Sequence, residues 1–227
     1  MTHESGSLAP SDVRGMFDRI APVYDAMNRV MTVGLDRSWR RLAAQAVVQP
    51  GDRVLDACCG TGDLTLAAER EGGVVTGLDF SERMLERARR KSRSIEWVQG
   101  DLLALPFADG VFDAATVGFG VRNVDDLPRA LVELRRVLRG GGRLAILEIT
   151  QARGVLRPFF NLWLDRVVPL VGRVLPGGRA YTYLPASVRR FPGAEDLVAL
   201  LEEVGFTGAR FRLLGGTIVA LHTGTAA

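Results

Sequence analysis

The sequence is poor in cysteine and histidine, and this scarcity excludes two kinds of site. Its 227 residues include two cysteines, the adjacent Cys58 and Cys59, and two histidines, His3 and His222. Neighbouring cysteines rarely bridge each other, so no disulfide framework is expected, which suits a reducing cytoplasm. A zinc site needs a fuller set of nitrogen and sulfur ligands, so we expect no metal and interpret both cysteines as packing residues.

The sequence also lacks an excess of one charge and any long apolar run. It has 29 basic and 26 acidic residues, a net charge of +3, which is too small to indicate a nucleic-acid-binding surface. No window approaches the roughly 18 uninterrupted apolar residues of a membrane-spanning helix. The N-terminus has no basic start followed by an apolar core, as a signal peptide would. We therefore expect a cytoplasmic protein.

What is present is a hydrophobic content of 47%, which is enough for a substantial core in one large domain. We expect residues 1–12 to be disordered and residues 13–227 to form a single domain. Between 13 and 49 the apolar residues recur at helical spacing, with breaks at Pro22 and Gly34, which predicts two or three helices.

From residue 53 to 150 short β-rich runs alternate with helical patterns. The runs are RVLDA (53–57), VVTGLD (74–79), SIEWVQGD (94–101), FDAATVGF (112–119) and GRLAILEIT (142–150). Ser81 is predicted to be a helix N-cap, and Gly140 to Gly142 are predicted to end a helix. Strands that alternate with helices predict βαβ units, and hence a doubly wound α/β domain with a parallel sheet.

After residue 150 this alternation lapses. Residues 151–190 are apolar and helix-like but are interrupted by prolines, which predicts a helical insertion. A helix over 194–206 follows, and two strands over 207–214 and 216–224, joined through Gly215 and Gly216, predict an antiparallel hairpin at the edge of the sheet.

The stretch VLDACCGTGDL (54–64) resembles several ligand-binding loops. A P-loop ends in GK followed by Ser or Thr, whereas Asp63 follows Gly62 here and would repel a phosphate. A dinucleotide-binding loop needs a third small residue where this chain has Thr65, so binding of NAD or FAD is disfavoured. Gly60 and Gly62 instead allow a ligand without phosphate to approach the backbone closely at the end of a strand.

Acidic residues end the next two strands. Asp79 follows Gly60 by 19 positions and ends the second strand. A carboxylate at this place can accept hydrogen bonds from both hydroxyl groups of a ribose. Asp101 is placed to bind an adenine amino group. Together with Asp56 or Asp63, these acids favour a cationic nucleoside, as S-adenosylmethionine is. The alternative is that they form turns and cap helices.

At this point a family resemblance is apparent. The combination DxxxGTGDL, Asp79 and GDxxALPF is similar to class I methyltransferases. The segments FDRIAPVYDAMNRVMTVGLDRSWRR (17–41), FGVRNV (119–124), YLPASVRRFP (183–192) and GTIVALHTG (216–224) resemble the quinone-biosynthesis C-methyltransferases of the UbiE/MenG family. This resemblance implies a Rossmann-like fold with a seven-stranded, mostly parallel sheet, a helical lid over 13–49 and the insertion over 151–190.

The same resemblance implies transfer of a methyl group from S-adenosylmethionine to a ring carbon of a polyprenylated hydroquinone in menaquinone biosynthesis. Positions 61, 79, 101 and 102 (Thr61, Asp79, Asp101 and Leu102) match the cofactor-binding positions of the family, and Gly118 falls where some members have serine. Some members have Asn-Ala at positions 101 and 102. We favour demethylmenaquinol over a 2-polyprenyl-6-methoxy-benzoquinol as the acceptor.

Carbon methylation needs a quinol that has lost a hydroxyl proton, which makes the ring carbon nucleophilic. Arg122 is our first catalytic candidate, as an orienter of a water or a stabiliser of the phenolate, and Asn123 could orient the same group. The alternative is an ion pair of Arg122 with Asp125 or Asp126. Tyr24 could cover the methionine part of the cofactor or simply pack against a helix.

The residues alone do not decide the roles of Glu148, His222 and the apolar segment 155–175. Glu148 could accept a proton, cap a helix or form an ion pair, and His222 is interpreted as structural. The apolar segment 155–175 could line a channel for the isoprenoid tail or belong to the core. The resemblance leaves room for peripheral membrane contact and for a homodimer. Two other functions stay in view, a methyltransferase acting on another small acceptor and a silent methyltransferase-like subunit.

Overall fold

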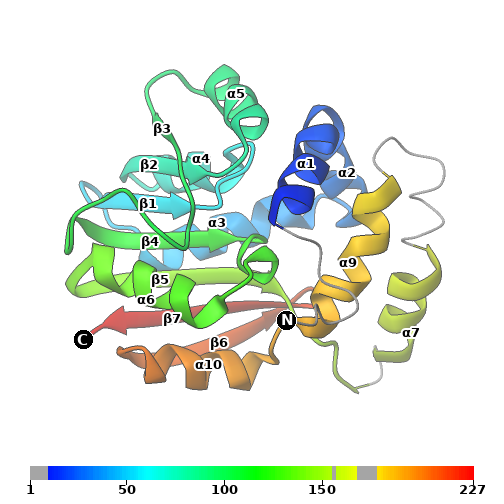
Figure 1. Ribbon diagram of the computed structural model, residues 1–227. Coiled ribbons are helices and arrows are strands. Elements are labelled where there is room, and N and C mark those ends of the chain that lie inside the picture. The colour runs from blue at the N-terminus through cyan, green and yellow to red at the C-terminus, as the bar shows by residue number, and fades with distance from the viewer. Residues whose placement is uncertain (1–9, 155–156, 168–177) are drawn as a thin grey trace.

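The computed structural model describes residues 10–154, 157–167 and 178–227. Within them, seven strands form one sheet in the order β3-β2-β1-β4-β5-β7-β6 (Figure 1). The strands are β1 (Arg53–Ala57), β2 (Val74–Asp79), β3 (Glu96–Gln99), β4 (Phe112–Gly118), β5 (Leu138–Ile149), β6 (Phe206–Leu214) and β7 (Val219–Ala226).

The first five strands pair in parallel, whereas β7 pairs antiparallel with both β5 and β6. The predicted doubly wound sheet and its C-terminal hairpin are therefore confirmed, with β6 at the edge. The helices are α1 (Pro10–Ile20), α2 (Tyr24–Met31), α3 (Leu35–Val47), α4 (Asp63–Arg70), α5 (Glu82–Lys91), α6 (Leu127–Val137), α7 (Arg157–Leu162), α9 (Gly178–Arg190) and α10 (Ala194–Glu203).

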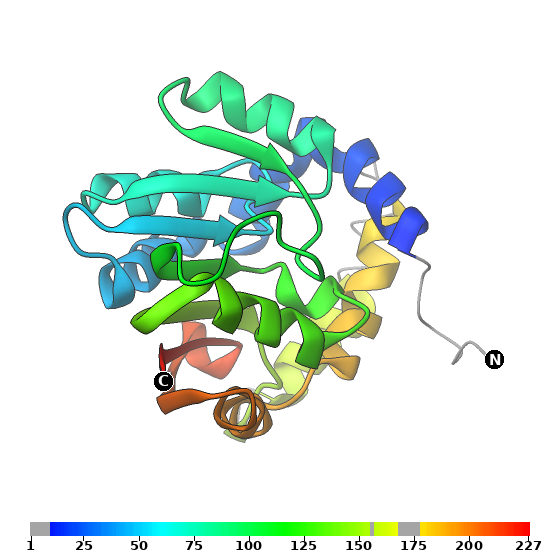
Figure 2. The same ribbon diagram turned by 60° about the vertical axis from the view of Figure 1, so that its left-hand side comes forward.

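The sheet is covered on both faces because its central strands are apolar at successive positions. In β5, Leu144 and Ile146 pack on one face with α6 and α10, while Ala145 and Leu147 pack on the other face with α3 and α4. Successive side chains of a strand point to opposite faces, so a run without polar residues has to be covered twice. Figure 2 shows the sheet between these helices.

Local signals explain where the helices begin, and one prediction of a helix end is wrong. Ser81 caps α5 as predicted, because its hydroxyl accepts a hydrogen bond from the Met84 N–H at 3.2 Å. The helix before the glycine triplet ends at Val137, earlier than predicted, and Gly140 to Gly142 lie inside β5. Gly141 has a φ of 78°, and the pairing with β4 shifts register beside this stretch, as at a β-bulge.

Several helices lie beyond the carboxyl ends of the parallel strands. Figure 1 shows α1, α2, α7 and α9 grouped at this end, with α1 beside α9. Helix α3 also comes from the expected lid segment, 13–49, but it packs against α4 and β5. Residues 1–9 of the segment expected to be disordered, and residues 155–156 and 168–175 of the apolar segment, lie outside the described residues. Among the described helices, none is both long and apolar enough to cross a membrane.

Candidate functional site

A first cavity opens at the carboxyl ends of β1, β2 and β4, with a volume of about 150 Å³. Parallel strands end at the same edge of a sheet, so the loops that follow them converge there. The turn after β1, the end of β2, the loop after β3 and the end of β4 supply most of the wall. Its members include Gly60, Thr61, Asp79, Asp101, Leu102 and Gly118, six of the seven residues predicted to bind a cofactor.

The seventh residue, Gly62, has a packing role. A Cβ at Gly62 would lie 2.5 Å from Cη2 of Trp97, and its φ is 85°. A Cβ at Gly60 would meet nothing within 4 Å, although its φ of 56° is also left-handed. Thus Gly60 leaves open space beside the backbone at the cavity, whereas Gly62 lets the loop and Trp97 come together.

Asp79 braces this loop. One carboxylate oxygen accepts a hydrogen bond from the Gly60 N–H at 2.8 Å, and the other accepts one from the Ser81 N–H at 2.9 Å. Burial raises the pKa of Asp79 to about 6, although these N–H donors act to lower it. Each oxygen keeps a further lone pair, so Asp79 can still accept hydrogen bonds from hydroxyl groups of a ligand.

The other acids differ in position. Asp56 is fully buried and accepts hydrogen bonds from Thr65 and Thr116, at 2.6 and 2.8 Å. Burial raises its pKa to about 6. Asp63 lines the cavity, so of the two alternatives for the third acid it is the one placed there. Asp101 is exposed and accepts a hydrogen bond from the Leu103 N–H at 2.9 Å, which is a turn contact.

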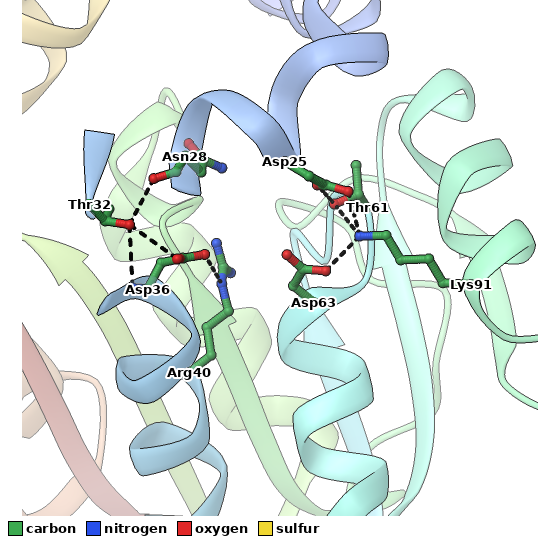
Figure 3. Close-up of polar contacts among 8 residues, drawn as sticks. All are labelled: Asp25, Asn28, Thr32, Asp36, Arg40, Thr61, Asp63 and Lys91. Atoms are coloured by element: carbon green, nitrogen blue, oxygen red, sulfur yellow. Dashed lines mark hydrogen bonds and ion pairs between the residues drawn. The ribbon is translucent and has the colours of Figure 1, made fainter. Parts of the chain in front are cut away.

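Thr61 connects the glycine loop to helix α2. Its hydroxyl donates to Oδ1 of Asp25 at 2.5 Å, and Lys91 lies 2.7 Å from Asp25 Oδ2 and 2.6 Å from Asp63 Oδ1 (Figure 3). Burial alone would raise the pKa of Asp25, but hydrogen bonds from Lys91 and Thr61 and the charge of Lys91 hold it below its usual value. This cluster fastens α2 over one side of the first cavity.

A second cavity of about 310 Å³ adjoins the first. Its wall is mainly apolar and is built from α1, α2, α3, α9 and the region of Phe160 and Trp163. Five residues line both cavities and so form their shared wall: Phe17, Tyr24, Arg40, Phe119 and Asn123. Tyr24 packs edge-on against Phe17, with ring centroids 6.2 Å apart.

Arg122 lines the second cavity from the 3-10 helix η2 (Val121–Asn123). Its Nη1 lies 2.6 Å from Oε1 of Glu148 and donates to the Phe119 carbonyl at 2.7 Å. The side chains of Arg122 and Glu148 are 9% and 1% exposed. The predicted alternative of a surface pair with Asp125 or Asp126 is therefore wrong. Of the three roles considered for Glu148, the ion pair is the observed one.

Asn123 and Arg122 have unused hydrogen-bonding atoms in this region. Oδ1 of Asn123 and Nε of Arg122 are buried and have no hydrogen-bond partner among the described residues. Such groups are rare in folded proteins because an unpaired buried polar atom is unfavourable. An uncommitted acceptor on the wall between the two cavities can bind a hydroxyl group of a ligand.

Of the residues interpreted as structural, His222 lines neither cavity, whereas Cys58 and Cys59 line the first. His222 lies on β7, is 1% exposed, and contacts the Ala194 carbonyl through Nε2 at 3.0 Å. Burial lowers its pKa. Burial also raises the pKa of the Cys58 and Cys59 thiols, which disfavours a reactive thiolate. Among the described residues no group of His, Cys, Asp and Glu could hold a metal ion.

Two residues of the site were missed from the sequence, Asp36 and Arg40. Both are buried on α3, at 4% and 7% exposure, and both face the second cavity. They continue the helical stripe of Ala43 and Val47, because positions 36, 40, 43 and 47 fall on one face of a helix. Two charged residues on an otherwise apolar helix face are the sequence pattern from which they could have been predicted.

The chain is similar to known proteins along nearly its whole length. The model of the ubiE/COQ5 methyltransferase family matches residues 5–226. A 2-phytyl-1,4-naphtoquinone methyltransferase from Synechococcus elongatus is 43% identical over 94% of this chain and 97% of its own length. A demethylmenaquinone methyltransferase from Renibacterium salmoninarum is 40% identical (98% and 95%), and one from Thermus thermophilus is 42% identical (92% and 99%).

Solved structures agree on the fold. A SAM-dependent methyltransferase from Thermotoga maritima superposes with a TM-score of 0.70 at 22% identity, over 94% of this chain and 99% of that one. Another from Aquifex aeolicus gives a TM-score of 0.61 at 16% identity, over 97% and 100%. At these identities the likeness concerns the architecture alone.

Proposed function

The chain belongs to the ubiE/COQ5 methyltransferase family and uses S-adenosylmethionine, and from this premise we propose that it methylates a ring carbon of a polyprenylated hydroquinone. The acceptor we propose is demethylmenaquinol, a naphthoquinol, because the relatives named above are naphthoquinone and demethylmenaquinone methyltransferases. A benzoquinol with the same kind of tail is the second candidate.

The observation that carries this proposal is the pair of adjoining cavities. One is rich in acids and backbone groups, and the other is mainly apolar, and five side chains divide them. Methyl transfer needs a polar cofactor and a hydrophobic ring held against each other with water kept out. The shared wall of Phe17, Tyr24, Arg40, Phe119 and Asn123 is where the two would meet.

The donor set of the first cavity fits S-adenosylmethionine. Gly60 leaves open space beside the backbone, Asp79 has lone pairs for two ribose hydroxyls, and Asp63 adds negative charge. Arg40 is the single Lys or Arg among the described residues that line it, so the cavity does not suit a phosphate but can accept one carboxylate. When bound, the cofactor supplies a methyl group activated by a sulfonium.

In the acceptor cavity the protein's own groups would position the ring. Glu148 neutralises Arg122, and a guanidinium is a poor base, so we assign Arg122 to holding η2 and directing its remaining N–H groups at the quinol oxygen. Asn123 Oδ1 would accept a hydrogen bond from a ring hydroxyl. Tyr24 would close the wall over the reacting carbon.

The rim of the second cavity suggests how a long apolar tail arrives. Val33 and Leu35 line that cavity and are 87% and 49% exposed, and Phe159 on the neighbouring α7 is 65% exposed. Exposed apolar side chains around an apolar opening are typical of contact with a lipid surface. We infer that this rim rests on the membrane from which the quinol enters.

Liposome flotation tests this contact. The wild-type protein is expected to float with vesicles that contain the quinol, and Val33→Asp with Phe159→Asp is expected to stay at the bottom. The control is Val74→Asp, since Val74 is 68% exposed but lies at the start of β2, away from the rim. Equal flotation of all three proteins would contradict the role of the rim.

Methyl transfer itself is tested with labelled S-adenosylmethionine and two reduced acceptors, demethylmenaquinone and 2-polyprenyl-6-methoxy-benzoquinone. Label in the naphthoquinol, at a kcat/KM at least about tenfold above that for the benzoquinol, is the expected result, a difference of about 1.4 kcal/mol in transition-state binding. If neither quinol is labelled while the cofactor still binds, a methyltransferase acting on another small acceptor becomes the better proposal.

A further inference from the structure

The acceptor cavity contains few groups able to take a proton. Among the described residues that line it, the titratable and charged ones are Tyr24 on α2, Asp36 and Arg40 on α3, Arg122 on η2 and Tyr183 on α9. Guanidinium groups stay protonated in proteins, and tyrosine hydroxyls ordinarily keep their proton at neutral pH. A carboxylate is the one side chain of this set that is ordinarily deprotonated at neutral pH.

The contacts of Asp36 leave its carboxylate short of donors. Oδ1 lies 3.1 Å from the Thr32 hydroxyl, but that hydroxyl has one proton and lies closer, at 2.7 Å, to the Asn28 carbonyl (Figure 3). Oδ2 lies 3.8 Å from Nε of Arg40, which is too long for a hydrogen bond. Within the described residues, no other group donates to Asp36.

A carboxylate that is 4% exposed normally has a full set of hydrogen bonds, because burying an unpaired charge is strongly unfavourable. Asp36 lines the acceptor cavity, so a ligand bound there can supply the donor that the carboxylate lacks. We propose that Asp36 is the proton acceptor of the reaction, and that the hydroxyl group of the quinol is the donor it lacks. This inference rests on the proposed function and names a catalytic residue for it.

The step balances with one proton released. The O–H bond of the quinol breaks and its proton passes to Asp36, while the ring carbon forms a bond to the methyl carbon. The bond between the methyl carbon and the sulfonium sulfur breaks, and its electron pair stays on sulfur. The C–H proton of the methylated carbon then moves to the ring oxygen, which restores the aromatic quinol, and the proton on Asp36 leaves to solvent.

Arg40 would assist this step through its position on the shared wall. It lies one helical turn after Asp36, it lines both cavities, and its guanidinium lies 5.1 Å from the centroid of the Phe119 ring. A positive charge beside the developing phenolate lowers the energy of that anion. The competing explanation for Asp36 is structural, since an acid in the first turn of a helix interacts favourably with the helix dipole.

The pH dependence of Asp36→Asn separates the two explanations. Asparagine keeps the size of the side chain but cannot take the proton, so kcat at pH 7 is expected to fall on the order of 10²- to 10⁴-fold. A phenolic hydroxyl ionises unaided near pH 10, so kcat of the variant is expected to rise about tenfold per pH unit between 7 and 9. The affinity for S-adenosylhomocysteine is expected to change less than about threefold.

Two further variants complete the test. Asp36→His supplies a different proton acceptor and is expected to recover at least a tenth of the lost activity. Its kcat is expected to fall at a higher pH than that of the wild-type protein as the solution is acidified, because imidazole titrates above a carboxyl group. Asp109→Asn is the matched control, the same substitution at a side chain that is 80% exposed and outside both cavities. It is expected to behave as the wild-type protein.

Either of two results would overturn the role of Asp36. One is a kcat of Asp36→Asn within about threefold of the wild-type value. The other is a reduced kcat that does not rise with pH while S-adenosylhomocysteine binds normally, which indicates a positioning defect. Failure of the proposed function is distinguishable, because the wild-type protein would then label neither quinol, and that result would overturn both proposals.

Discussion

Arg122 and Glu148 form a buried ion pair, and replacing one partner should destabilise the protein more than replacing both. Nη1 of Arg122 lies 2.6 Å from Oε1 of Glu148, and the side chains are 9% and 1% exposed. In Arg122→Met the Glu148 carboxylate would stay buried without a cation. It would keep the Ile149 N–H at 2.9 Å as its main hydrogen-bond donor.

Breaking one side of a buried pair in this way typically costs about 3–5 kcal/mol. For a domain of this size, each kcal/mol lowers the melting temperature by about 2–4 °C, so Arg122→Met is expected to melt about 6–20 °C below the wild-type protein. In Arg122→Met with Glu148→Gln no buried charge is left, and the new side-chain amide can still accept a hydrogen bond from the backbone. The double variant is expected to regain at least about 2 kcal/mol of this loss.

Urea unfolding of the wild-type protein, the two single variants and the double variant measures this coupling. The double variant then separates stability from chemistry, because it is expected to be folded and to bind S-adenosylhomocysteine but to transfer methyl groups at least about tenfold more slowly. A loss below about 1 kcal/mol in Arg122→Met would refute the argument from burial. Wild-type methyl transfer in the stable double variant would remove Arg122 from the catalytic machinery.

Three further predictions concern the first cavity. Gly62→Ala is expected to destabilise the protein by about 1–3 kcal/mol, because its Cβ would lie 2.5 Å from Trp97, whereas Gly60→Ala is expected mainly to weaken binding of S-adenosylhomocysteine in calorimetry. Binding is expected to weaken as the pH falls below about 6, where Asp79 with its raised pKa takes up a proton and loses acceptors, and Asp79→Asn should bind weakly at every pH without this slope. Arg40→Met is expected to weaken S-adenosylhomocysteine but not 5′-methylthioadenosine, which lacks the carboxylate, and equal losses would contradict the assignment of Arg40 to that group.

The fold could be predicted from local patterns because its signals are local. Runs of β-branched and apolar residues separated by helical periodicity indicate βαβ units, and the hairpin carries its own Gly215–Gly216 turn. The glycine triplet misled the prediction, because glycine marks both helix ends and β-bulges. Only the pairing of β5 with β4 distinguishes the two, and that pairing joins residues far apart in the sequence.

The first cavity was also largely predictable, because one strand end after another contributes to it. Once the sheet is known to be parallel, Gly60, Asp79, Asp101 and Gly118 must converge at one edge. The structural and ligand-binding interpretations of Asp79 turn out to be compatible. Its two oxygens brace the loop through backbone N–H groups, and each oxygen still has a lone pair free.

The second cavity was not predictable in this way, because it is assembled from helices whose relative placement no local signal specifies. Nevertheless, helix α3 contained a usable clue. An apolar stripe normally faces a core, and a charge placed on it needs a partner that the fold must supply. Asp36 and Arg40 lie on the stripe of Ala43 and Val47, and at 3.8 Å they satisfy each other only in part. A charged pair on an apolar stripe, with incomplete contacts inside the protein, therefore indicates that the stripe faces a ligand at that point.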